Sequence, residues 1–385
     1  MVARALIAIV VAFGMQVPQP PTPASPSLVP RLVVQGTQFV DADTGALHVP
    51  RWVSGLSLLA RTPEQQEAFL GWAARTGFNG VRVFAGALPW AGQTPEAART
   101  GLVPLLDRAA RHGLVVEVTA LTDTATGYDA RQHVADIVDR LAGRRGVVLE
   151  LANEIGHGTQ APIVTAAHMR QWGRELAQPR GVLWAVGAPL VSDTPVKGMY
   201  AGHGGTYATA HLNRGGAPWQ QVRRVREIYR IVELHRTPAI NNEPIGCAEP
   251  GTIGQRWTDP AMFFALGALD RAFGLGGVHH TEAGLRAQLP GPVQQRCAEA
   301  YVAGHRAIDT VLPGVVGRFY DRGTRDDVVA EFGFLTETKG VMVLLGVRGK
   351  PVPTLAPGWT TVRTVASHGA RDGRRVDIVE IRLSR

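Results

Sequence analysis

Eight short apolar runs divide residues 51–282 into repeated strand and helix steps. The runs are rich in Val, Ile, Leu and Ala, as buried parallel strands are. Longer amphipathic segments separate most of them, which is typical of βα units on a parallel sheet. Eight steps of this kind predict an α/β fold, a closed (β/α)8 TIM barrel, in preference to an open sheet. The expected strands are Trp52–Leu59, Gly80–Phe84, Leu114–Ala120, Val147–Ala152, Val182–Val186, Thr206–His211, Pro238–Asn242 and Gly277–His280.

The segments between these runs have helical character. Several begin with Pro or Thr-Pro, which suits the first turn of a helix. By contrast, Gly187–Gly205, between the fifth and sixth strands, is expected to be irregular. The expected helices lie near Pro63–Thr76, Pro95–His112, Ala130–Leu141, Thr165–Leu176, Trp219–Leu234 and Pro260–Phe273.

The chain is longer than a barrel requires. It has 385 residues, whereas a barrel of this kind uses about 250. Before the first strand, residues 32–45 alternate in polarity and turn on Asp-Thr-Gly, which predicts an N-terminal hairpin over one end of the barrel. Four runs separated by Gly- and Pro-rich turns predict a small C-terminal β-module. These runs are Val328–Phe332, Gly340–Val347, Trp359–Val365 and Val376–Leu383.

The N-terminus has the pattern of an export signal. Arg4 precedes the apolar run Ala5–Phe13, and a Pro-rich stretch follows from Val17 to Pro30. The run is too short to span a bilayer comfortably, which favours a signal peptide followed by an extended tether. The protein is therefore expected to be secreted or periplasmic, with no stable membrane insertion after processing. The alternative is an N-terminal membrane anchor that keeps residues 1–20 on the mature protein.

The predicted organisation has three parts. Residues 1–30 form the signal peptide and tether, residues 31–312 the barrel with its hairpin, and residues 313–385 the β-module packed on the barrel. Two cysteines, Cys247 and Cys297, are present. An oxidising compartment would permit a disulfide between them, and two buried thiols are the alternative.

Composition indicates a globular protein without a nucleic-acid partner. Hydrophobic residues make up 45% of the chain and charged residues 19%, a balance that can bury a large core. The formal net charge is +8, but the arginines that dominate it are spread along amphipathic segments with acidic residues between them. Such a distribution is typical of solvated helix faces.

Two glutamates stand where apolar runs end. Glu154 closes the run that begins at Val147, and Glu243 closes the run that begins at Thr237. The carboxyl ends of parallel barrel strands carry the chemistry of this fold, so both carboxylates are expected at one cavity. Cleavage of an acetal needs a proton for the leaving oxygen and a negative charge or nucleophile beside the anomeric carbon, which two carboxyl groups can supply. Asn153, directly before Glu154, could hold a sugar hydroxyl.

At these residues the chain resembles the retaining glycoside hydrolases of clan A, most nearly family 5, the cellulase- and mannanase-like group. In that clan an Asn-Glu pair ends the fourth strand and supplies the acid/base, and a Glu ending the seventh strand is the nucleophile. Asn153-Glu154 and Glu243 match both strand counts. The resemblance covers about residues 32–285. Further matches are Gly77-Phe78-Asn79-Gly80-Val81-Arg82-Val83 at the second strand, His211 at the sixth, and the hairpin followed by Arg51-Trp52-Val53-Ser54-Gly55.

The resemblance implies roles for these residues. Glu154 would be the acid/base and Glu243 the nucleophile of a double displacement that cleaves O-glycosidic bonds with retention. Arg82 would orient Glu243, while Asn153 and His211 would contact the substrate. His280, near the end of the eighth strand, is a further candidate substrate-binding residue that is not part of the family pattern. The implied partner is an oligo- or polysaccharide, and this chemistry requires no cofactor or metal.

Three framework positions depart from the family pattern. Thr119-Ala120-Leu121-Thr122-Asp123 stands where a histidine usually follows the third strand, and Asn213 takes the place of a tyrosine beyond the sixth. His279-His280-Thr281-Glu282 replaces the tryptophan that usually closes the eighth strand. Aromatic platforms set sugar recognition, so the sugar and linkage are left open. Trp90 or Trp257 is a candidate substitute platform, with simple packing as the alternative for each.

Two other functions fit parts of the pattern. Five histidines fall at or beyond predicted strand ends, which suits a metal-dependent barrel hydrolase, although the first strand ends without a His-x-His pair. They are His157, His203, His211, His279 and His280. A catalytically inactive, carbohydrate-binding envelope protein of the same clan is the second alternative, because a fold does not guarantee its function.

Overall fold

The computed structural model of the protein describes residues 29–188, 204–211, 217–244, 246–250, 257–325, 328–349, 355 and 357–384. The expected signal peptide and nearly all of the tether lie outside these residues, as do His203 and Asn213. Most of the segment 187–205 also lies outside them. In the described part, no helix combines the length and the apolar character needed to cross a membrane.

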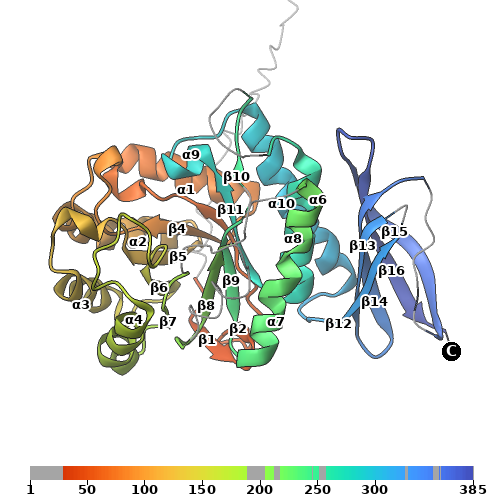
Figure 1. Cartoon of the computed structure of the whole chain (residues 1–385), viewed down its shortest axis with the longest axis horizontal. Helices are drawn as coiled ribbons and strands as arrows, with labels where there is room; N and C mark the ends of the chain where they lie inside the picture. The colour runs from red at the N-terminus through yellow and green to blue at the C-terminus, as the bar shows by residue number, and fades with distance from the viewer. Residues whose placement is uncertain are drawn as a thin grey trace, which may run out of the picture.

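The central domain is a (β/α)8 barrel, as the strand pattern predicts (Figure 1). Its parallel strands pair in the order β7-β6-β5-β4-β3-β11-β9-β8, with the short strand β10 (Gly246–Cys247) beside β11. Hydrogen bonds from the backbone of Thr206 and Tyr207 to the Trp184 carbonyl, 2.8 and 3.3 Å, link the β7 and β8 sides. The barrel strands are β3 (Arg51–Ser54), β4 (Gly80–Phe84), β5 (Val115–Leu121), β6 (Val147–Ala152), β7 (Trp184–Ala185), β8 (Ala208–His211), β9 (Ala239–Glu243) and β11 (Gly276–Thr281).

Local sequence explains where the helices around the barrel begin and end. Thr62 and Thr94 cap two helices that each start with proline, and the Thr62 cap is a reciprocal box with Gln65. Gly77 ends the first of them with φ +105°, a left-handed conformation that favours glycine. The helices are α1 (Pro63–Thr76), α2 (Pro95–Arg111), α3 (Ala130–Leu141), α4 (Ala166–Trp172), α6 (Pro218–Arg223), α7 (Val225–His235), α8 (Pro260–Phe273), α9 (Glu282–Leu285) and α10 (Pro292–Val311).

Several predicted elements need correction. The first strand ends at Ser54 because the backbone then enters a 3-10 turn at Leu58–Ala60. The helix expected at Thr165–Leu176 changes after Trp172 into a π-helical turn, and the one expected at Trp219–Leu234 is divided at Arg224 into α6 and α7. The fifth strand has only two residues, Trp184–Ala185. Helix α10 was not predicted.

The N-terminal hairpin is present with a different turn. Strands β1 (Leu32–Gln35) and β2 (Gln38–Asp41) pair antiparallel across Gly36 and Thr37, not across Asp-Thr-Gly. Gly36 has φ +61°, which the tight two-residue connection requires. Phe39 of this hairpin contacts Tyr207 of the barrel, with ring centroids 5.6 Å apart. The hairpin therefore covers the amino-terminal end of the barrel strands, the lower end in Figure 1.

The C-terminal part is a five-stranded antiparallel sheet, with one strand, β12, that was not predicted. Its strands pair in the order β12-β13-β14-β16-β15. Every residue of α8 from Ala261 to Phe273 is buried, so this helix needs apolar cover on all sides. The barrel covers one side and the sheet the other; Phe273, for example, contacts Phe334 with ring centroids 4.9 Å apart (Figure 1). The strands are β12 (Arg318–Arg325), β13 (Val328–Leu335), β14 (Lys339–Val347), β15 (Trp359–Gly369) and β16 (Arg375–Leu383).

The two cysteines form a disulfide. Cys247 lies on β10, four residues after Glu243, and Cys297 lies on α10, with their Cα atoms 6.5 Å apart. Both side chains are fully buried. The bond therefore links the segment after the seventh barrel strand to helix α10, which precedes the C-terminal sheet.

Candidate active site

Both predicted catalytic glutamates lie at the carboxyl ends of barrel strands. Glu243 is the last residue of β9, and Glu154 follows β6 by two residues. Glu154 has φ +43°, an unusual backbone conformation for a residue with a side chain. Such conformations cost about 1–3 kcal/mol and persist where the surrounding structure imposes them, which is common at functional sites.

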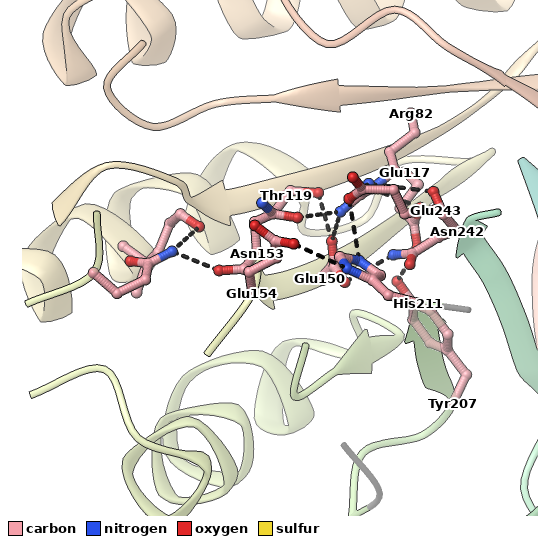
Figure 2. A network of polar contacts seen from close by, with 12 residues as sticks. Arg82, Glu117, Thr119, Glu150, Asn153, Glu154, Tyr207, His211, Asn242 and Glu243 are labelled. Carbon is pink, nitrogen blue, oxygen red and sulfur yellow. Dashed lines mark hydrogen bonds and ion pairs between the residues drawn. The ribbon is translucent and has the colours of Figure 1, made fainter. Parts of the chain in front are cut away.

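His211, the last residue of β8, lies between the two carboxylates (Figure 2). Its Nδ1 atom is 3.7 Å from Glu154 Oε1, and its Nε2 atom is 3.4 Å from Glu243 Oε2. One oxygen of each carboxylate and one His211 nitrogen all lie within 4.8 Å of one another. Residues 154, 211 and 243 therefore converge on one point at the mouth of the barrel, as the sequence predicts.

Arg82 is completely buried beneath this point and contacts three carboxylates. Its Nη2 atom lies 2.6 Å from Glu150, its Nε atom 3.5 Å from Glu117, and its Nη1 atom 3.7 Å from Glu243. Figure 2 shows the guanidinium within this ring of acidic side chains. The predicted pairing with Glu243 is present, but it is the longest of the three contacts.

The two deep carboxylates differ in protonation. Burial, with the charge of Glu150 in addition, raises the pKa of Glu117 to about 8. Burial also acts on Glu150, but the Arg82 charge and hydrogen bonds from Thr119 and Arg82 outweigh it and lower the pKa of Glu150. At neutral pH Arg82 is therefore paired with an ionised Glu150, while Glu117 is mostly a neutral acid.

Side-chain donors complete the environment of these two acids. Thr119 Oγ1 donates to Glu150 Oε2 at 2.7 Å, and Asn242 Nδ2 donates to Glu150 Oε1 at 2.8 Å. Tyr207 donates its hydroxyl hydrogen to Glu117 at 3.1 Å. Both oxygens of Glu150 are thus occupied, which holds the acid rigidly against Arg82.

Asn153 is oriented by two neighbours. Its Oδ1 atom accepts a hydrogen bond from Arg82 Nη2 at 2.9 Å, and its carbonyl accepts one from Gln160 Nε2 at 2.6 Å. The amide oxygen is therefore directed at Arg82. The Nδ2 group is the part of the side chain that could donate to a sugar hydroxyl.

His280 lies on the eighth barrel strand, and its orientation follows from its neighbour. The ring of His279 packs in the helix layer, with centroids 5.2 Å from Phe263 and 5.9 Å from Phe78. Adjacent residues of a strand face opposite sides, so His280 faces the barrel interior. It also pairs with Gly246 of β10, the strand that follows Glu243.

Sequence reasoning missed the residues that hold Arg82. Glu150 and Glu117 lie inside runs that were treated only as apolar strands, although a charged residue in such a run must find a partner when buried. The run itself contained a usable clue, because Glu150 lies inside the strand Val147–Ala152, where a side chain that faces the barrel interior is buried. The other missed residues are Thr119, Tyr207 and Asn242.

Solved structures with the same fold include glycoside hydrolases. A family 5 glycoside hydrolase from Bacteroides vulgatus superposes with a TM-score of 0.65 at 11% identity, covering 93% of this chain and 95% of the other. A putative glycoside hydrolase from the same organism gives 0.62 at 15%, covering 94% and 84%. A β-glucanase from Saccharophagus degradans, in complex with cellotetraose, gives 0.52 at 14%, covering 76% and 99%.

The likeness establishes a shared fold. The barrel and its C-terminal sheet are those of family 5-like structures, which confirms the resemblance inferred from the motifs at the level of architecture. No protein-family model matches the chain, and no curated protein sequence matches it.

Four of the five histidines expected for a metal-dependent site lie in the described part of the chain, and these four do not gather at one place. His279 is in the helix layer, and His157 Nδ1 contacts the Thr159 hydroxyl at 2.9 Å. Among the described residues, the set whose geometry could hold a cation consists of Glu154, His211 and Glu243. This is the same set that the two-carboxylate chemistry uses.

The two candidate aromatic platforms differ in exposure. Trp90 is 56% exposed, on the loop between β4 and α2. Trp257 packs against the core and donates its indole N–H to Gln221 at 3.3 Å. Trp90 is therefore the more exposed of the two candidates.

Proposed function

We propose that the protein is a retaining glycoside hydrolase with Glu154 as acid/base and Glu243 as nucleophile. The observation that carries the proposal is the approach of the two carboxylates to within 4.8 Å on either side of His211. Retaining enzymes hold their carboxyl groups about 5–5.5 Å apart, whereas inverting enzymes need about 6.5–9.5 Å to admit a water molecule. The glycoside hydrolase structures that share the fold support the same reaction class.

In the first step the Glu243 carboxylate attacks the anomeric carbon and forms an ester bond to it. The glycosidic bond to the leaving oxygen breaks, and Glu154 gives that oxygen its proton. Arg82, next to Glu243, favours the ionised form that attack requires. The Nδ2 group of Asn153 would hold a hydroxyl beside the reacting carbon.

In the second step water replaces the leaving group. Glu154 now removes a proton from the water, which attacks the anomeric carbon and releases Glu243. His211 contacts both carboxylates, so it would hold them at a fixed separation through both steps. Two inversions at one carbon give net retention.

The test is a screen of aryl glycosides and polysaccharides with detection of the product anomer. The proposal expects a first-formed product with the substrate's anomeric configuration, and activity that Glu243→Ala abolishes. Glu154→Ala should lose activity on ordinary glycosides but keep the first step on a dinitrophenyl glycoside, whose leaving group needs no proton. An inverted product, or full activity in Glu243→Ala, would rule the mechanism out.

The same screen separates the alternatives. Inactivity on every glycoside class, with measurable binding of an oligosaccharide, supports an inactive carbohydrate-binding protein. Activity that is lost on exhaustive chelation and returns with added metal supports a metal-dependent hydrolase. The proposed enzyme keeps its activity through chelation.

We propose in addition that the enzyme is exported. The disulfide between Cys247 and Cys297 supports this, because such bonds persist in oxidising compartments. Sequencing the N-terminus of the mature protein tests it: a start beyond residue 13 is expected, and an intact start in a membrane fraction contradicts it.

A further inference from the structure

A polar cavity lies at the opposite end of the barrel from the candidate active site. Its volume is about 190 Å³, and its walls include Arg51 and Asn79, which stand at the amino-terminal ends of β3 and β4. His48, His305 and Arg271 also line it. The two catalytic glutamates lie at the carboxyl ends of their strands, so this cavity takes no part in the glycosidase chemistry.

The cavity has an excess of positive charge. Arg51 and Arg271 contribute two guanidinium groups, and Asp309 contributes the one carboxylate among the residues that line it. Arg271 is fully engaged: Nε donates to Asp309 at 2.6 Å, and its terminal nitrogens donate to the carbonyls of Val315 and Leu312 at 3.0 and 2.7 Å. Asp309 makes its direct ion pair with Arg271 and acts on Arg51 only through its charge, so the two guanidinium groups share one carboxylate.

The guanidinium group of Arg51 is held in place, and its two terminal nitrogens are available to a ligand. Its Nε atom donates to the Gly77 carbonyl at 2.7 Å, which fixes the guanidinium plane. Its two terminal nitrogens donate no hydrogen bond to any residue that the structure describes. A planar, fixed fork of this kind matches two oxygens of one oxyanion.

Two histidines add polar atoms without partners. His305 is completely buried and neither of its ring nitrogens has a hydrogen-bond partner among the described residues. The buried Nε2 atom of His48 also lacks one there. Buried polar atoms in native proteins are nearly always satisfied, and both histidines line the same cationic cavity, so an occupant of the cavity is a candidate partner for these three atoms.

We propose that this cavity binds a small tetrahedral oxyanion of the phosphate or sulfate class. The Arg51 fork would take two of its oxygens, and His305 and His48 would donate to the others. Burial and the nearby arginines lower the pKa of His305, and burial lowers that of His48 to about 4, so a bound anion would favour their protonation. Because β3, α10 and the turn at Gly314 all contact the cavity, the anion would stabilise the junction between barrel and C-terminal sheet.

The test is thermal unfolding of the full chain against inorganic phosphate, with ionic strength held constant by sodium chloride. A saturable rise in Tm of about 1–3 °C is expected for the wild type. Arg51→Gln should remove the rise, and Arg131→Gln, which alters an exposed arginine paired with Glu175, should keep it. The Arg51→Gln protein is expected to have a lower Tm without phosphate, since it loses the bond to Gly77; the readout is the phosphate-dependent increment.

His305→Phe gives a second variant that keeps the ring contact with Tyr301 and removes the ring nitrogens. Calorimetric titration with phosphate should show binding at least 10-fold weaker than in the wild type, the loss expected when one hydrogen bond to a charged group is removed. A linear rise in Tm that Arg51→Gln shares would be a general salt effect and would overturn the proposal. Crystals grown in selenate that show no anomalous scattering beside Arg51 would also overturn the proposal.

Discussion

The Nη2 atom of Arg82 lies 2.6 Å from Glu150 Oε2, whereas its Nη1 atom lies 3.7 Å from Glu243 Oε2. The arginine is therefore held first by an acid that does not face the substrate, and its contact with the nucleophile depends on that pairing. Asn153, which accepts from the same Nη2 atom, depends on it as well.

Glu150→Gln should lower kcat by about 100-fold, the size of loss that accompanies a misplacement of about 1 Å at a catalytic group. It should also lower the free energy of unfolding by about 3–5 kcal/mol, because Arg82 loses its closest counter-charge while buried. Steady-state kinetics and urea unfolding measure the two effects. KM should change little, since Glu150 does not touch the sugar.

Glu117→Gln is the matched control for this change. It alters a carboxylate that is equally buried and also contacts Arg82, but whose raised pKa already keeps it mostly neutral at pH 7. Its kcat should remain within about 10-fold of the wild type. Equal losses in both variants would contradict the different protonation of the two acids.

Trp90→Ala should weaken the binding of oligosaccharides without harming the chemistry, provided that the proposed glycosidase activity is present. The loop of Trp90 is fixed by Gln93, whose Nε2 atom donates to the carbonyls of Phe84 and Gly86 at 2.9 and 2.7 Å, so the exposed ring is held in position. We expect KM for an oligosaccharide to rise about 10-fold, which corresponds to the 1.4 kcal/mol that one aromatic contact can contribute.

The matched substrate for that prediction is an aryl monoglycoside, which is too short to reach a separate platform. Its kcat/KM should be the same in the variant and the wild type. Trp257→Phe, at the packed tryptophan, should leave both substrates unaffected at a temperature where the variant is folded. If Trp90→Ala changes neither substrate, the ring is not a sugar platform.

Much of the fold was predictable because its information is local. The strands Gly80–Phe84 and Val147–Ala152 and the helices α1, α3 and α8 have the predicted bounds. Each of the three helices has a Thr or Asp cap before an apolar period, and α1 and α8 also begin with proline. The fifth strand was overestimated, because Val182 and Val186 are buried without pairing in the ladder. Apolar character reports burial, and it does not report hydrogen bonding.

The candidate site was predictable in part for the same reason. The positions of Glu154, His211 and Glu243 follow from strand ends, which the sequence marks clearly. The contacts of Arg82 with Glu117 and Glu150 depend on which residues of three neighbouring strands lie at the same height inside the barrel. That alignment is set by the register of the closed sheet, which no local pattern specifies.

Asp270→Asn should change how stability depends on pH. Burial raises the pKa of Asp270 from 3.8 to about 8, against the opposing effect of the Tyr301 hydroxyl, which donates to it at 2.9 Å. The folded state thus binds this proton more tightly than the unfolded state does. The stabilisation that this bound proton provides is fully present below about pH 4, and it is lost as the pH rises to about 8.

The asparagine side chain of this variant does not titrate. The free energy of unfolding of the Asp270→Asn variant should therefore increase relative to that of the wild type as the pH rises through this window. The gain should be at least about 1.4 kcal/mol, which corresponds to a single unit of pKa. Urea unfolding at several pH values measures it, and taking the difference removes the effect of the histidines that both proteins share. A difference that stays constant with pH would contradict a protonated Asp270.

Removing the disulfide should destabilise the protein by about 2–4 kcal/mol. The bond joins positions 50 residues apart and both sulfurs are buried, so its loss releases a long loop in the unfolded chain. Cys247→Ala, Cys297→Ala and the double variant should all lose nearly the same amount, because either change removes the one bond. In excess reductant, the free energy of unfolding of the wild type should approach that of the double variant. The reductant should not affect the double variant itself.

Activity near the unfolding transition should fall first in the variants, since Cys247 follows Glu243 by four residues. Two free thiols titrated in the unfolded, unreduced wild type would contradict this account.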